Sequence, residues 1–110
     1  MAMFPFRKSL PSKRTARTWS IMSRVPATLR MQWSGRLAAG VTAKDMMLHM
    51  IGRFGMNGGQ YQAIEIWAEA VRALGMAERM TLSNMSAEMG AQAGLVAPDA
   101  TTREWLLTET

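Results

Sequence analysis

The charge of this chain is divided sharply along its length. Residues 1–36 hold eight Lys and Arg and no Asp or Glu, whereas residues 37–110 hold five Lys and Arg against eight Asp and Glu. Residues 1–24 also contain two Pro and several Ser and Thr, and they lack helical or strand periodicity. A segment of this composition buries too little apolar surface to fold. The sequence therefore predicts a disordered basic arm over 1–24 and one small domain over 25–110.

Three interpretations of the basic arm stay open. Its Arg-rich, Ser-containing and acid-free composition is typical of a mitochondrial transit peptide. Its positive charge, together with Trp19, also suits phosphate contacts with nucleic acid or with another anionic partner. The third interpretation gives the arm no selected role. We expect a cytoplasmic protein, with mitochondrial targeting as the alternative, and no membrane span, because no run of about 18 apolar residues occurs.

The chain has no cysteine and a single histidine. This excludes disulfides, thiolate nucleophiles and the usual ligand sets of structural zinc and iron–sulfur clusters. A metal site built from several histidines is excluded as well. The one histidine, His49, falls on the polar face of an expected helix, and we interpret it as a surface residue. We therefore expect no metal and no cofactor bound by this chain alone.

Hydrophobic periodicity predicts an α/β fold of short strands with covering helices. Apolar and polar residues alternate over 28–34, which indicates a half-buried strand, and 63–67 forms a second strand pattern. Between them, Thr42 and Asp45 are spaced nearly as a capping box, which opens a helix that ends at Gly55. The apolar stripe of this helix consists of Met46, Met47, Met50, Ile51 and Phe54.

Three shorter segments complete the pattern. The glycine-rich loop Gly55–Gly59 matches neither dinucleotide-binding nor P-loop spacing, so it gives little support for a nucleotide site. A helical turn is expected over 69–74, and a last helix begins at Thr101.

Residues 79–99 carry the most informative pattern. The first part is rich in Ala, Met, Leu, Glu and Gln and predicts a helix. Asn84 and Glu88 are four residues apart, so on one α-helix they lie one turn apart on the same face. Leu95–Ala97 is a short strand or an extended exit, stopped by Pro98. By itself, an amide and a carboxylate on such a face more often indicate a solvated face than a site.

Residues between Thr28 and Leu106 resemble, in order and spacing, the large subunit of the aconitase superfamily of hydro-lyases, most closely its isopropylmalate dehydratase branch. The matching positions are Gly40–Asp45, Gly58, Gly59, Glu65, Glu69–Arg72, Arg79–Thr81, Asn84, Met85, Glu88, Gly90, Ala91 and Gly94–Asp99. The resemblance implies an internal fragment of a three-layer α/β/α domain. It also implies a lyase that dehydrates and rehydrates a hydroxy di- or tricarboxylic acid, such as isopropylmalate in leucine biosynthesis.

The family's cofactor is a [4Fe–4S] cluster held by three cysteines, in a downstream half that this chain does not contain. By position, Asn84 matches the family's Asn that packs against the cluster, and Glu88 matches the Glu that hydrogen-bonds the iron-bound hydroxyl or water. We expect Arg79 to be structural, either pairing with a carboxylate or packing its stem. The base that removes the substrate's α-proton and a convincing Arg cluster for its carboxylates are both missing. The isolated chain is therefore expected to be inactive.

The chain departs from the family pattern at four positions. Gln60 and Tyr61 stand where the family has Thr-Gly, and Ala68 and Glu78 stand where it usually has Gly. Such a replacement matters only where the backbone needs a positive φ.

Two functions follow as hypotheses. In the first, the chain is a truncated product or one piece of a split enzyme, with the rest of the large subunit and a small subunit as partners and a hydroxy acid as substrate. In the second, it is a non-enzymatic interaction module whose basic arm binds nucleic acid or an anionic partner, although nucleic acid is not the partner that we expect.

Overall fold

A parallel three-stranded sheet lies at the centre of the domain. The structure, a computed structural model, describes residues 3–10 and 17–109, and of residues 3–10 and 17–23 it describes the backbone alone. The sheet has the order β3-β4-β5, with β3 at Thr28–Gln32, β4 at Ala63–Trp67 and β5 at Ala93–Val96. Both predicted strands are confirmed, and the apolar run before Pro98 supplies the third.

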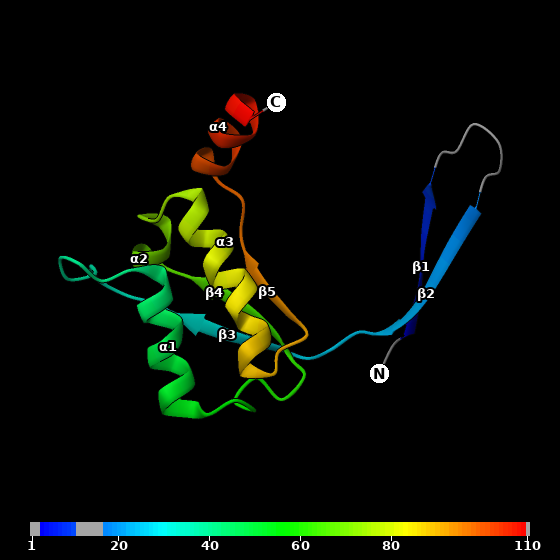
Figure 1. Cartoon of the computed structure of the whole chain (residues 1–110), viewed down its shortest axis with the longest axis horizontal. Coiled ribbons are helices and arrows are strands. Elements are labelled where there is room, and N and C mark those ends of the chain that lie inside the picture. The colour runs from blue at the N-terminus through cyan, green and yellow to red at the C-terminus, as the bar shows by residue number, and fades with distance from the viewer. Residues whose placement is uncertain (1–2, 11–16, 110) are drawn as a thin grey trace.

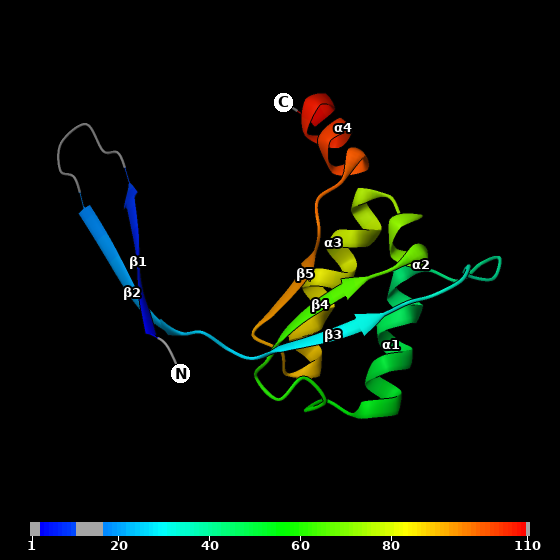
Figure 2. The ribbon, with the colours of Figure 1, turned by 180° about the vertical axis from the view of Figure 1, so that it is seen from behind.

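One face of this sheet packs against two helices. Helices α1 (Ala43–Phe54) and α3 (Met76–Met85) lie in front of the strands in Figure 1. In Figure 2, seen from behind, the strands lie in front and these helices do not cover that face. The core between the layers consists of Met31, Ala43, Met46, Met47, Ile64, Ile66, Val71, Leu74, Leu82, Met85 and Met89. The predicted α/β class is thus confirmed, with the described residues forming a sheet and one helical layer.

Helix α1 begins and ends as its sequence predicts. The backbone N–H of Thr42 donates to Asp45 Oδ2 at 2.8 Å, and the N–H of Asp45 donates to Thr42 Oγ1 at 3.4 Å, which completes the capping box. The helix ends at Gly55, whose φ of 81° is in the region that glycine adopts freely. His49 is exposed, as expected. Phe54, predicted as the last member of the apolar stripe, is 56% exposed.

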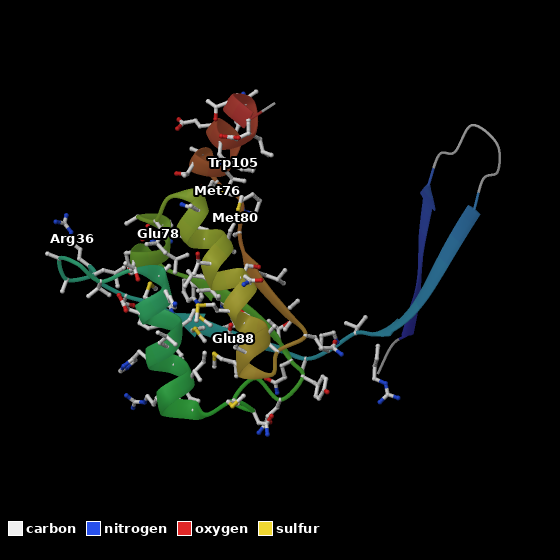
Figure 3. All side chains as sticks on the ribbon, in the orientation of Figure 1. Arg36, Met76, Glu78, Met80, Glu88 and Trp105 are labelled. Atoms are coloured by element: carbon white, nitrogen blue, oxygen red, sulfur yellow. The ribbon has the colours of Figure 1, made fainter. Side chains whose placement is uncertain are left out.

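Three short elements connect the rest of the chain. Helix α2 spans Glu69–Arg72, the 3₁₀ helix η1 spans Ser86–Met89 and helix α4 spans Ala100–Glu109. Helix α4 has no fully buried residue. Figure 3 shows its Trp105 close to Met76 at the start of α3. None of the helices in the described part is long and apolar enough to cross a membrane.

A hairpin precedes the domain. Strands β1 (Met3–Leu10) and β2 (Arg17–Arg24) pair antiparallel with each other, and Figure 1 shows them apart from the sheet and its helices. The sequence predicts no regular structure here, so the described backbone differs from that expectation. Aromatic and β-branched residues such as Trp19 and Ile21 favour strands locally. A two-stranded hairpin alone is marginally stable in water, so the dispensability of the arm stays a prediction.

The three interpretations of the arm depend on side chains before residue 24. Those side chains, including Trp19, lie outside the described part of the structure, and so do residues 11–16 in full. Transit-peptide, nucleic-acid and unselected roles for the arm therefore remain hypotheses from the sequence.

Candidate functional site

The segment that carries Asn84 and Glu88 packs its apolar side onto the core. The buried side chains of this segment are Leu82, Met85 and Met89. Asn84 and Glu88 are both exposed on the opposite side, and neither side chain has a hydrogen bond or ion pair with another described residue. The two polar side chains are therefore not used to hold this fold together.

The segment is not one continuous α-helix. Helix α3 ends at Met85, and the chain tightens into η1 before Gly90, which has a φ of 76°. The buried hydroxyl of Ser86 donates to the carbonyl of Leu82 at 2.9 Å, four residues back. Hydroxyl bonds of this kind compete with regular helical bonding and often bend a helix.

This break alters the relation that the sequence predicts between Asn84 and Glu88. A 3₁₀ helix has about three residues per turn, so a spacing of four no longer stacks two side chains. Asn84 lies in the last turn of α3 and Glu88 lies in η1. The two residues stay close along the chain, but they do not share one face of a single α-helix.

The glycine-rich loop docks beside Glu88, which the sequence did not reveal. The N–H of Gly59 donates to the carbonyl of Met89 at 2.8 Å, and the N–H of Tyr61 donates to the carbonyl of Gly90 at 2.9 Å. A Cβ on Gly59 would lie 2.9 Å from the backbone nitrogen of Ala91, so this approach requires glycine. The paired glycines were the one sequence signal for such a contact.

A surface cavity of about 570 Å³ lies between the loop and the turn after η1. Its lining consists of Asn57, Gln60, Tyr61, Ala87, Gly90 and Ala91. Gln60 and Tyr61 have φ values of 44° and 59°, at the two positions where the family pattern has Thr-Gly. The loop keeps a left-handed backbone there without glycine. Two lining residues, Ala87 and Gly90, are close neighbours of Glu88 in the chain. Figure 3 shows Glu88 far along the α3–η1 segment from Glu78, which is near the start of α3.

Arg79 is structural, as expected. Its guanidinium is buried, and it donates to the carbonyls of Leu74 and Arg72, both at 2.9 Å, and to Asp99 Oδ1 at 2.7 Å. The hydrogen bond from Arg79 is the main cause that lowers the pKa of Asp99 to about 2. The N–H and hydroxyl of Thr42 likewise lower the pKa of Asp45. Both carboxyl groups cap helix ends, and Asp99 also anchors the guanidinium of Arg79.

The described residues contain no group of three or more His, Cys, Asp or Glu that could hold a metal ion. Iron–sulfur clusters are held by cysteine thiolates, and the whole chain has no cysteine. Its residues therefore do not fit a cluster as ligands. What the α3–η1 segment offers is the exposed amide of Asn84 and the exposed carboxyl group of Glu88, close along the chain to Ala87 and Gly90, which line the cavity.

A family model described as the aconitase family (aconitate hydratase) matches residues 14–110. This chain belongs to the aconitase family. It is also 52% identical, over 86 residues, to the 3-isopropylmalate dehydratase large subunit of Anaeromyxobacter dehalogenans. That match covers 78% of this chain and 18% of the relative, so this aconitase-family chain spans less than a fifth of the relative's length. The resemblance stated from the sequence is confirmed.

Proposed function

We propose that residues 25–110 supply one segment of an aconitase-type hydro-lyase site, which another polypeptide completes. The supporting observation is the 52% identity to a 3-isopropylmalate dehydratase large subunit, combined with the exposure of Asn84 and Glu88. A polar side chain with no structural partner is free to contact a substrate. Loops and element ends on a rigid scaffold are where such contacts usually lie.

In this proposal Glu88 acts on the substrate hydroxyl. A carboxyl group can accept a hydrogen bond from a hydroxyl or deliver a proton to the oxygen that leaves, and Asn84 can donate and accept beside it. The substrate class is a hydroxy di- or tricarboxylic acid, with isopropylmalate as the specific candidate. The proposed partners are the remaining part of the large subunit and a small subunit, in the cytoplasm. The chain alone offers no base for the α-proton, so turnover requires those partners.

A segment exchange tests this function. Residues 28–106 of this chain replace the matched segment in the Anaeromyxobacter large subunit, and the product is assayed with its small subunit for dehydration of 3-isopropylmalate. We expect activity in the exchanged protein and a loss of about 100-fold in kcat for Glu88→Gln, which is the usual scale of proton-transfer catalysis.

Glu78→Gln is the matched control. It makes the same chemical change on the same segment, but Glu78 lies at the opposite end of α3 from Glu88 (Figure 3). Glu78→Gln should leave kcat within about twofold. Equal losses for the two variants, or an inactive exchanged protein that is folded, would exclude the proposed role of Glu88.

A further inference from the structure

Strand β3 is an edge strand, and no described strand pairs with its outer side. The carbonyl of Ala27 accepts from the N–H of Ala63 at 2.9 Å, and the N–H of Trp33 donates to the carbonyl of Trp67 at 2.9 Å. Backbone groups alternate sides along a strand, so the odd-numbered residues of β3 bond to β4. The N–H and C=O groups of Thr28, Arg30 and Gln32 therefore point away from β4, and all three residues are exposed.

An apolar cavity of about 440 Å³ lies along the same edge. It is lined by Leu29, Arg30, Met31, Gln32 and Trp33 of the β3 segment, by His49, Met50, Arg53 and Phe54 of α1, and by Gly58 and Met89. Phe54, which the sequence predicts as part of a buried stripe, is more than half exposed here. Leu29 and Met31 point toward the helical layer, so the inward side chains of a next strand would enter this cavity.

We propose that the free edge of β3 accepts a strand from a partner polypeptide that carries the rest of the large subunit. The proposal rests on the proposed function. An exposed strand edge is a template for pairing with another chain, and this chain matches only 18% of its relative. Backbone groups of Thr28, Arg30 and Gln32 would bond the added strand, which is a common mode of peptide recognition.

Charge sets the chemistry of the added strand. The charged side chains that line the cavity are Arg30 and Arg53, with His49 beside them and no carboxylate. Arg30 is already paired with Glu65 at 3.1 Å, whereas Arg53 has no carboxylate partner among the described residues. The partner strand is therefore apolar on its inward side, with an acidic residue near Arg53. A second copy of this chain fits less well, because pairing β3 with β3 would bring arginines together.

Hydrogen exchange on the full chain tests this edge. The probe is the Anaeromyxobacter large subunit from which the matched 86 residues have been deleted, produced together with this chain. We expect the complex to slow exchange at the amides of Thr28, Arg30 and Gln32 by at least about tenfold. No complex, or a complex in which these three amides exchange as in the free chain, overturns the proposal. Protection of the same amides in the chain alone, through self-association, would assign the edge to a second copy and also overturn it.

Two proline variants localise the contact. Gln32→Pro removes an N–H from the free edge of β3 without removing a bond to β4, and Leu95→Pro does the same on the free edge of β5. The N–H of Gln92 donates to the carbonyl of Gln62 at 3.0 Å, so by alternation the backbone N–H of Leu95 points away from β4. We expect Gln32→Pro to weaken the complex at least about tenfold and Leu95→Pro to leave it unchanged. Equal weakening would place the contact elsewhere.

The segment exchange separates the two proposals. There, residues 28–106 are covalently part of a large subunit, so activity does not depend on association in trans. Exchange at Thr28, Arg30 and Gln32 is measured in that folded protein as well. If the exchanged protein is active but these three amides exchange rapidly, the edge contact is overturned and the proposed function stands. If the amides are protected but the protein is inactive, the proposed function is overturned and the edge contact stands.

Discussion

Nη1 of Arg79 lies 2.7 Å from Oδ1 of Asp99, and this ion pair joins the start of α3 to the start of α4. The same Oδ1 accepts from the N–H of Thr102 at 3.3 Å, so Asp99 also caps α4. Because the other guanidinium nitrogens bond to carbonyls around α2, one buried side chain ties three segments together. Arg79 and Asp99 are both among the residues that match the family pattern, and their role here is architectural.

The pH dependence of stability follows from this pair. The pKa of Asp99 is about 2 in the folded chain against an ordinary 3.8, chiefly because Arg79 donates to it. A carboxyl group whose pKa is lower in the folded than in the unfolded state stabilises the fold at pH values above its unfolded-state pKa. This contribution is lost as the pH falls from about 4 to about 2. Urea unfolding between those pH values should show a smaller loss of stability in Asp99→Asn than in the wild type. Equal slopes in the two proteins would contradict the prediction.

The elements with local signals could be predicted from the sequence. Strand β4 occupies the predicted residues, and α1 begins at the capping box of Thr42 and Asp45. These signals are alternation and capping, which involve residues within a few positions of each other. The exposed state of His49 and the structural role of Arg79 were also predicted correctly.

The features that could not be predicted from the sequence depend on contacts between distant residues or on one hydroxyl group. Asp99 is 20 residues from Arg79, and the docking of Gly59 on Met89 joins segments whose order in the sheet is not encoded locally. The bond from Ser86 to Leu82 breaks the helix between Asn84 and Glu88, although the residue pattern there is helical. Phe54 is exposed because nothing in the described part covers the edge of β3, and a periodicity argument assumes that every apolar face is covered.

Ala68 is held in a backbone conformation that glycine prefers. It is buried, with φ 95° and ψ −171°, a region that residues with a Cβ rarely occupy. Ala68→Gly should relieve strain of about 1–3 kcal/mol and lose about 1 kcal/mol through added freedom of the unfolded chain and a missing methyl group. We expect a net gain of about 0.5–1 kcal/mol in the free energy of unfolding, measured with urea.

Ala70→Gly is the matched control for Ala68→Gly. Ala70 is equally buried, but it lies in the helical turn of α2. The same loss of a methyl group should lower its free energy of unfolding by about 1 kcal/mol. Similar destabilisation of both variants would mean that Ala68 is not strained in solution.

Deletion of residues 1–24 tests the boundary of the domain. The described strands of the arm pair with each other and not with the sheet of the domain. We expect residues 25–110 to unfold with a free energy within about 1 kcal/mol of the full chain, because the first residues of a domain contribute little unless they are anchored. A larger loss would show that the arm packs on the domain.

Glu88→Gln in the isolated chain separates a functional residue from a structural one. Glu88 is exposed, and its side chain has no hydrogen bond or ion pair with another described residue. Removing its charge should therefore change the free energy of unfolding by no more than about 0.5 kcal/mol, the usual range for such surface sites. Arg79→Met, which leaves the carbonyls of Leu74 and Arg72 without their donor, should cost about 2–4 kcal/mol in the same urea experiment. A loss above about 2 kcal/mol for Glu88→Gln would make Glu88 a structural partner, and a fall in kcat of the segment-exchanged enzyme would then no longer be evidence for catalysis.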